Sequence, residues 1–286
     1  MKKAAVITAI VLLIAAAALL IQFSGTDTEY SRFNTNWNGT SDFFASADAP
    51  DIYNYKDLEG KTNTTLLVIA PTKEFGGNAL LTYVKSGNTL IIADQSGNAN
   101  RFLLTTAGTG IRVVDAPLRS SDQEYKDAGL IRGYVTEGSS LFGTDAEKLF
   151  VNYPGYVTGG KTILETSQLS WIDTNGNNVA DKDEPLKVYS LAASYTIGSG
   201  KIIVISDPSI FVNSMQNIQY KENTAVLNAL KEQNLLIDQT ASDTAKGGGI
   251  FGLLPLVYHY PAAGAAILAG IFLLCGLICV RRGKKR

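Results

Sequence analysis

Cysteine and histidine are nearly absent from this sequence of 286 residues. The two cysteines, Cys275 and Cys279, lie in an apolar segment near the end of the chain, and the single histidine, His259, lies just before it. The long middle part therefore has no thiol for a disulfide or a nucleophile, and no imidazole for a Ser-His-Asp triad or a zinc site. These enzyme classes are excluded for it, and we expect a protein that is not an enzyme.

Charge is absent from two long segments. Residues 4–23 are apolar except for Thr8 and Gln22, and residues 261–280 contain no charged side chain. As a helix, each segment rises about 30 Å, which is the thickness of a membrane's hydrocarbon core. We predict a transmembrane helix in each segment, with a cleaved signal peptide as the alternative for the first.

Basic residues flank both apolar segments, in the short tails at residues 1–3 and 281–286. Because short cationic tails stay in the cytoplasm, both termini are predicted to be cytoplasmic and residues 24–260 to lie outside the cell membrane. The predicted partners are therefore membrane lipid, contacted through the two helices, and a protein of the cell envelope.

Basic residues are scarce between the two apolar segments. Residues 24–260 contain 18 Lys and Arg against 26 Asp and Glu, which is a net charge of about −8. Nucleic acids and anionic lipids bind basic faces, so we expect no nucleic-acid partner. The negative charge is compatible with cation binding.

Patterns of buried strands and of helices alternate within residues 31–236, which we predict to be one α/β domain. The continuous apolar runs that indicate strands buried on both faces are 65–70, 89–93, 111–114 and 201–206. The segments with the spacing or the end signals of helices are 78–85, 100–106 and 223–233. This alternation predicts a mostly parallel sheet with right-handed crossovers.

The middle of the domain, about 116–200, is less regular. Short strands are predicted at 161–165 and 187–196 between turn residues, so we expect an irregular insertion with antiparallel strands. Residues 237–249 are polar and end in three glycines, which is typical of a flexible linker.

Four short motifs resemble those of one family. The motifs are Phe33–Thr40, Thr89–Asp94 with the glycine-bounded helix before it, Ser170–Gly176 and Ser206–Asn213. Together they resemble archaeal membrane proteins of the DUF4350 type. The resemblance implies a three-layer fold similar to flavodoxin and to class-I glutamine amidotransferases, as in domains of gliding-motility and intraflagellar-transport proteins. It does not imply the amidotransferase reaction, because the cysteine and histidine of that reaction are missing from residues 31–236.

Residues 173–184 have the pattern of a twelve-residue calcium loop. Its ligand positions fall on Asp173, Asn175, Asn177, Val179 (through its carbonyl), Asp181 and Glu184. Asn178 replaces the usual glycine at the sixth position, and asparagine tolerates the positive φ needed there. Pro185 follows at once, so no exiting helix is expected. We predict a structural Ca²⁺ site, and a surface turn rich in Asn and Asp is the alternative.

Polar side chains follow two of the predicted strands, at the edge where open α/β sheets bind ligands. The residues predicted to contact a ligand there are Asp94, Gln95, Ser96, Asp207, Ser209 and Asn213. The alternative is that these aspartates bond only to the backbone next to them. Asp207 with Pro208 after it is typical of a helix N-cap, and Asp94 begins a turn.

These patterns predict a non-catalytic binding or scaffold module, anchored in the membrane and stabilised by calcium. It would belong to an envelope or transport-associated assembly. The alternative is a hydrolase or transferase that acts on an envelope glycan or a polar small molecule through Asp94 and Asp207. The two hypotheses separate on whether these carboxylates converge in an open pocket or cap the loops that follow them.

Overall fold

The computed structural model describes residues 26–72, 75–122, 126–136, 141–142, 147–216 and 221–247. The helices in these residues are short. The α-helices are α2 (Ser41–Ala47), α3 (Asn78–Lys85) and α4 (Lys221–Lys231). The remaining helical turns are the π-helix η2 (Phe102–Thr106) and the 3-10 helices η1 (Tyr55–Leu58), η3 (Pro208–Phe211), η4 (Asn213–Gln216) and η6 (Asp243–Ala245).

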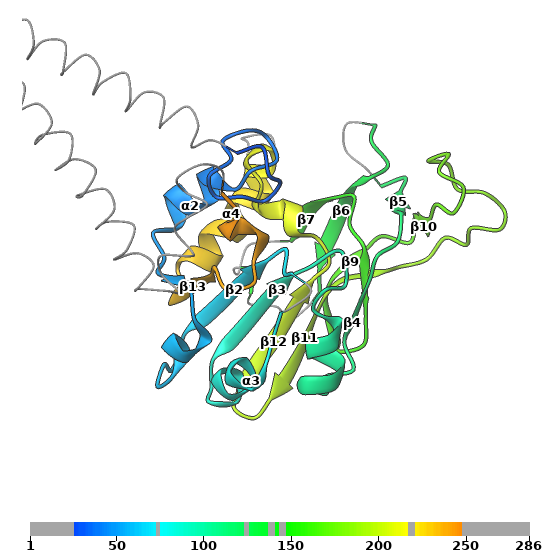
Figure 1. The fold of residues 1–286 in the computed structure, drawn as a ribbon. Coiled ribbons are helices and arrows are strands. Elements are labelled where there is room, and N and C mark those ends of the chain that lie inside the picture. Colours follow the sequence, from blue (N-terminus) through cyan, green and yellow to red (C-terminus); the bar gives the residue numbers. More distant parts are fainter. Residues whose placement is uncertain are drawn as a thin grey trace, which may run out of the picture.

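Strands make up most of the regular structure in the described residues (Figure 1). Their bounds are β1 (Asp51–Ile52), β2 (Thr65–Ile69), β3 (Thr89–Ala93), β4 (Arg112–Val114), β5 (Leu118–Ser120), β6 (Leu130–Val135), β7 (Lys148–Asn152), β8 (Tyr156–Thr158), β9 (Lys161–Thr166), β10 (Ser170–Ile172), β11 (Ser190–Ile197), β12 (Gly200–Ile205) and β13 (Leu235–Asp238). Within this part of the chain, eleven strands form one mixed sheet in the order β1-β13-β2-β3-β12-β11-β9-β6-β7, with β8 paired to β11 and β4 paired to β8. Strands β5 and β10 form a separate pair.

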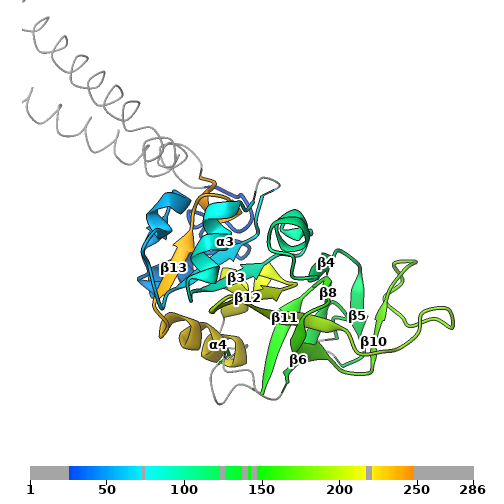
Figure 2. The ribbon, with the colours of Figure 1, turned by 90° about the horizontal axis from the view of Figure 1, so that it is seen from below.

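One half of the sheet, from β1 to β12, is parallel throughout. Its strands are buried on both faces, as their continuous apolar sequences require. Along β2, Leu66 and Val68 pack with α3 and η2, whereas Leu67 and Ile69 pack with α2 and α4. Helices α3 and α4 accordingly lie on opposite faces of the parallel half (Figure 2).

The other half of the sheet, from β11 to β7, is antiparallel. It begins at a tight hairpin, in which Ile197 of β11 pairs with Gly200 of β12 and only two residues lie between them. Gly198 in that turn has φ +60°, a conformation that glycine adopts at little cost and that two-residue hairpins need. The hairpin fixes β11 antiparallel to β12 and so ends the parallel half.

The predicted fold class, a mostly parallel flavodoxin-like and amidotransferase-like domain, is wrong. The structure is a large mixed sheet with few helices in the described residues. The run at 111–114 was expected to extend the parallel sheet, but β4 pairs antiparallel with β8. Residues 116–200, expected to form an irregular insertion, contribute β6, β7, β9 and β11 to the main sheet itself. A buried apolar run has the same sequence pattern in a parallel and in an antiparallel sheet. The direction of pairing depends instead on the connections between strands.

The predicted two-pass membrane topology, with both termini in the cytoplasm and residues 24–260 outside, is also corrected. No helix in the described part of the chain is long and apolar enough to cross a membrane. The segments on which the topology rested, 4–23 and 261–280, lie outside the described residues.

The predicted linker at 237–249 differs from the structure where the structure describes it. Residues 237 and 238 complete β13, which pairs with both β1 and β2. Asp243–Ala245 forms η6, and the backbone N–H of Asp243 donates to the carbonyl of Ala70. This segment is therefore tied to the sheet through residue 243.

Candidate functional site

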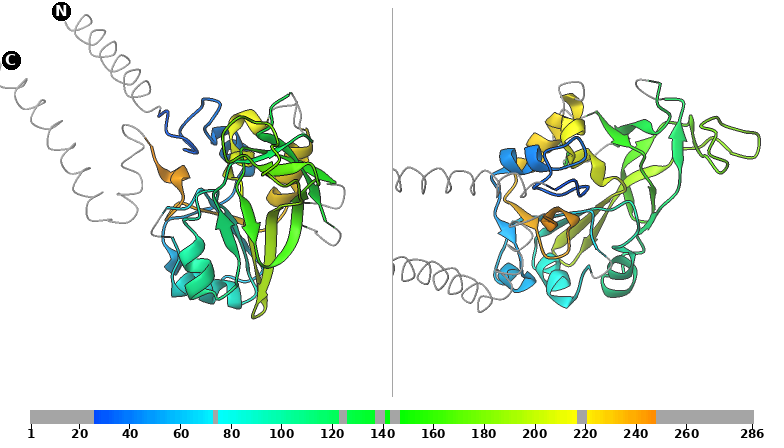
Figure 3. Two further views of the ribbon diagram at one scale, coloured as in Figure 1. Left: turned by 90° about the vertical axis from the view of Figure 1, so that its right-hand side faces the viewer. Right: turned by 45° about the horizontal axis from the view of Figure 1, so that its top comes forward.

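The predicted calcium loop lies in an arm that extends from the body of the domain (Figures 1 and 3). We define the arm as residues 169–188, which comprise β10 and the loop that follows it. The backbone N–H of Asp173 anchors it to the domain by donating to the Pro117 carbonyl, and within the arm the backbone N–H of Lys187 donates to the Ser170 carbonyl. The loop therefore leaves and rejoins the domain at neighbouring points.

The first and last ligand positions of the loop hold it closed. Asp173, only 2% exposed, accepts hydrogen bonds from the backbone N–H groups of Gly176, Asn177 and Asn178. Glu184, only 3% exposed, accepts from the backbone N–H and the hydroxyl of Thr174, at 2.6 and 2.8 Å. Because Thr174 follows Asp173 directly, these contacts bring the two ends of the loop together.

The middle ligand positions also face one another. The Asp181 carboxylate accepts from the side-chain amides of Asn175 and Asn177, at 2.6 and 2.8 Å. In the described residues, no group of three or more His, Cys, Asp or Glu side chains is placed to hold a metal ion. The donor set of the loop, carboxylate, amide and carbonyl oxygen, is nevertheless the set that Ca²⁺ prefers. Binding would require the two amides to turn their oxygens toward the ion.

The asparagine at the sixth position has a partner outside the loop. Asn178 has φ +59°, and its side-chain oxygen accepts from Nε of Arg119 at 2.8 Å. The same nitrogen lies 3.9 Å from the Asp173 carboxylate, and the guanidinium lies 4.7 Å from the centre of the Tyr153 ring. Asn178 thus adopts the left-handed backbone conformation that glycine usually provides, and its side chain also connects the loop to the domain. The sequence pattern did not indicate Arg119, which the pairing of β5 with β10 places opposite Trp171.

The predicted ligand residue Asp94 is used within its own turn. It is 1% exposed and accepts from the backbone N–H groups of Gly97 and Ala99. Burial raises the pKa of the Asp94 carboxyl, and these backbone hydrogen bonds oppose that shift. Beside it, the Gln95 side chain donates to the carbonyl of Tyr153.

Asp207 is fully buried and caps η3, with Pro208 at the first helical position. Its two carboxylate oxygens accept from the backbone N–H groups of Ser209 and Asn152, both at 2.7 Å. Burial raises the pKa of Asp207 to about 6. The Ser209 hydroxyl faces the carbonyl of Asn152 at 3.4 Å.

Asn213 serves as a tie between segments. Its amide nitrogen donates to the carbonyl of Asn36 and to the hydroxyl of Ser41, and its oxygen accepts from the backbone N–H of Asp42. It therefore fastens the chain before α2 to the start of η4.

A cavity of about 240 Å³ lies at the carboxyl edge of β2 and β3. Its lining includes Asp94, Gln95 and Ser96, whereas Asp207, Ser209 and Asn213 are not part of it. Three lining carboxylates belong to Glu29, Asp94 and Asp243, of which the sequence pattern indicated only Asp94. The structure thus brings half of the predicted ligand residues together and separates the other half.

A further buried aspartate went unrecognised in the sequence. Asp238, at the end of β13, is fully buried and accepts from the backbone N–H groups of Thr240, Ala241 and Ser242. Burial raises the pKa of the Asp238 carboxyl. In the sequence, its place after the apolar run Leu235–Ile237 was the available signal.

Residues 32–230 match the family DUF4350, described as a domain of unknown function. No curated protein matches the chain. A solved structure of the β-galactosidase from Bacillus circulans sp. alkalophilus is similar, with 10% sequence identity and a TM-score of 0.33, over 57% of this chain and 25% of that one. The chain thus spans a quarter of the length of that enzyme, and a likeness of this degree carries no argument about fold or activity.

Proposed function

Since the chain belongs to the DUF4350 family, whose domain has no assigned function, we propose that it is a non-catalytic binding or scaffold module with an arm stabilised by calcium. The arm presents the binding surface, and the body of the domain supports it through the pairing of β10 with β5. The partner is a protein in a larger assembly. An archaeal source stays a prediction from the resemblance alone.

The observation that carries this proposal is the closure of loop 173–184. Asp173 and Glu184 are both nearly inaccessible to solvent, although carboxyl groups are costly to bury without polar partners. Nearby, Asp181 is held by two amides that carry oxygens of their own. A Ca²⁺ ion bound in the loop would neutralise the negative charges of these carboxylates, which the closed loop brings near one another. Binding to the folded state alone would stabilise the domain.

Exposed apolar side chains on the arm support the binding role. Leu169, Val179, Leu186 and Val188 are 49%, 59%, 50% and 40% exposed. Single exposed apolar residues are ordinary on protein surfaces, but a concentration of them on one projecting segment is typical of a contact surface. A calcium-stiffened arm loses less conformational entropy when a partner binds.

The alternative of a hydrolase or transferase loses its main support. Asp94 and Asp207 each accept hydrogen bonds from backbone N–H groups, which is the arrangement of capping residues. Asp207 is fully buried and does not line the cavity that contains Asp94. A pair of catalytic carboxylates would both have to reach the substrate.

Thermal unfolding of the full chain with and without calcium tests the proposal. For a Kd of about 10⁻⁴–10⁻³ M, roughly 10 mM Ca²⁺ should stabilise the wild type by about 1–3 kcal/mol and raise Tm by several degrees. Asp173→Asn and Glu184→Gln should each lose most of this calcium-dependent shift. Comparing each protein with and without calcium separates binding from the effect of the substitution itself.

The matched control is Asp183→Asn, which removes the same charge from an exposed position of the loop that is not a ligand position. It should keep the calcium-dependent shift. An unchanged wild-type Tm in calcium, or an equal shift with magnesium and in both ligand variants, would refute the calcium-stabilised module.

A further inference from the structure

Residues 186–188, which we call the arm edge, follow the predicted calcium loop and run beside β10 in the projecting arm (Figure 1). The backbone N–H of Lys187 donates to the Ser170 carbonyl of β10 at 2.9 Å. Because alternate residues of an extended chain face opposite sides, the N–H and carbonyl groups of Leu186 and Val188 point away from β10. In the described part of the chain these groups have no hydrogen-bond partner, and both residues are exposed.

Two other outer strands, β7 and β4, have such groups covered by side chains. In β7, the N–H and carbonyl of Phe150 pair with Oδ1 and Nδ2 of Asn223, both at 2.8 Å. In β4, the same groups of Val113 pair in the same way with Asn100, also at 2.8 Å. One asparagine amide thus takes the place of a neighbouring strand at each position, which blocks the addition of a further strand. Within the described residues, the arm edge has no such block.

Lys187 places a positive charge at the middle of the arm edge. Its ammonium group lies 4.8 Å from the centre of the Tyr189 ring, and no carboxylate in the described residues forms an ion pair with it. The flanking Leu186 and Val188 are 50% and 40% exposed, and by alternation they lie on the face opposite to Lys187. The arm edge therefore combines open backbone groups, one unpaired charge and two exposed apolar side chains.

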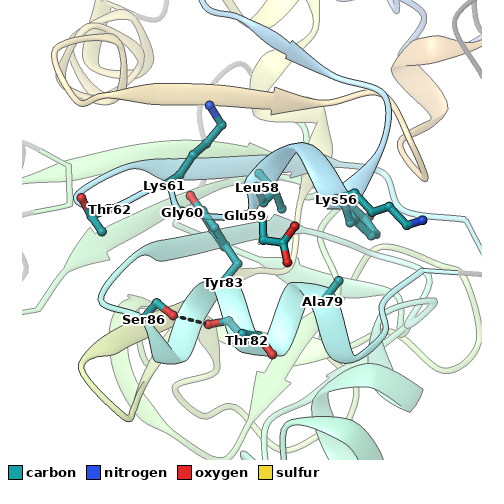
Figure 4. Close-up of a pocket in the computed structure, with 11 residues that line it drawn as sticks. Lys56, Leu58, Glu59, Gly60, Lys61, Thr62, Ala79, Thr82, Tyr83 and Ser86 are labelled. Carbon is teal, nitrogen blue, oxygen red and sulfur yellow. Dashed lines mark hydrogen bonds between the residues drawn. The ribbon is translucent and has the colours of Figure 1, made fainter.

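A groove of about 580 Å³ between η1 and α3 lacks this combination (Figure 4). Its apolar residues Leu58 and Tyr83 are only 2% and 3% exposed. The amino groups of Lys56 and Lys61 are directed away from the Glu59 carboxylate, so the charges do not converge. The groove therefore offers neither an accessible apolar surface nor a set of charges that act together.

We propose that the arm edge binds an extended segment of a partner protein, which adds to it as an antiparallel strand, as β5 pairs with β10. The segment carries an acidic residue opposite Lys187, with an apolar residue on each side of the acid that faces Leu186 or Val188. This inference rests on the proposed binding role of the arm and names the class of its partner. A second copy of the chain fits less well, because the register that pairs both open residues would place the lysines of the two copies opposite one another.

Fluorescence anisotropy on the full chain tests this inference, with the labelled pentapeptide Thr-Ile-Glu-Val-Thr as the probe. Addition of one short strand to an exposed edge is weak, so we expect saturable binding with a Kd on the order of 10⁻⁴ M. Methylation of the backbone nitrogens of the probe's isoleucine and valine removes the N–H groups that donate to the arm edge, and should weaken binding about tenfold or more. Methylation of the glutamate nitrogen, which points away from the arm edge, is the matched control and should change Kd by less than about threefold.

Variants of the chain assign the site. Lys187→Glu should weaken binding of the probe on the order of tenfold, and a probe with lysine in place of glutamate should bind this variant more tightly than it binds the wild type. Val188→Pro removes one open N–H group without breaking a hydrogen bond of the domain, and should also weaken binding. Lys161→Glu reverses a charge at an exposed position at the other end of β9 and should bind the probe as the wild type does.

The inference is overturned if the wild type shows no saturable binding, if the two methylated probes bind equally, or if Lys187→Glu does not prefer the lysine probe. A dimer in sedimentation velocity that Val188→Pro dissociates would assign the arm edge to a second copy and would overturn it as well. A retained calcium-dependent rise in Tm without probe binding would refute strand addition alone. Probe binding without that rise would refute the calcium-stabilised arm and leave strand addition supported.

Discussion

The parallel and antiparallel halves of the sheet use buried aspartates in different ways. At the carboxyl edge of the parallel half, Asp94, Asp207 and Asp238 each accept backbone N–H groups of the loop that follows the strand. In the arm, Asp173 also accepts three such groups and Glu184 is buried as well, but Asn175, Asn177 and Asp181 of the same loop are exposed or half-exposed.

This difference separates structural acids from acids that are available to a ligand. A carboxylate that already accepts backbone N–H groups in the interior has its charge balanced, and displacing those groups would leave them unpaired. In the arm, Asp181 faces amide groups that can turn to present oxygen. The acids of the parallel edge therefore support the fold, whereas an ion could bind the arm only by exchanging the hydrogen bonds among the exposed side chains of its loop.

The largest effect is expected from Asp207→Asn in the parallel half. The amide can accept only one of the two backbone hydrogen bonds and leaves the other N–H group without an acceptor. The substitution should lower the free energy of unfolding by about 1–3 kcal/mol in urea denaturation at pH 4. The exposed arm counterpart, Asp183→Asn, should change it by less than about 0.5 kcal/mol. Equal effects of the two would remove the distinction between the halves.

The pH dependence of Asp207→Asn sharpens the comparison. In the folded state the Asp207 pKa is raised to about 6 from its ordinary value of 3.8, so the folded state binds more protons between these values. Asp207 therefore contributes stability that is present at low pH and is lost as pH rises through the folded pKa. The loss of stability caused by the substitution should shrink from pH 4 to pH 7. A loss that grows with pH would contradict the buried environment of this carboxyl.

A smaller effect is expected where the arm meets the domain. Asn178→Gly relieves the positive φ but removes the acceptor of Arg119, and Arg119→Gln removes the donor. In a double-mutant cycle of urea denaturation, the two changes should couple by about 0.5–1 kcal/mol. If their effects simply add, the contact does not tie the arm to the domain.

The sequence predicted the strands of the parallel half well because burial on both faces leaves an unmistakable apolar run. The runs at 65–70, 89–93 and 201–206 correspond to β2, β3 and β12, and the helix at 78–85 has the bounds of α3. The direction of pairing was misjudged at 111–114, where β4 pairs antiparallel with β8, because an apolar run alone does not distinguish the two directions. Strand β13 was missed because its four residues lie before a polar stretch.

The candidate site was predictable in part for a similar reason. The contacts of loop 173–184 are local, so the spacing of its side chains alone indicated which of them face one another. Arg119 lies more than fifty residues earlier, and only the register of β5 against β10 brings it to Asn178. The sequence indicated capping roles for Asp94 and Asp207 through Pro208 and the turn after Asp94, but the N–H groups that they accept depend on the backbone of those turns.

Hydrogen exchange of backbone amides, with and without calcium, tests the central claim most directly. At about 10 mM Ca²⁺, we predict slower exchange for the amides of residues 174–184 and unchanged exchange for β2 and β3, because the ion stabilises the arm and leaves the parallel half as it is. The same exchange rates throughout loop 174–184 in both conditions would contradict the calcium-stabilised arm.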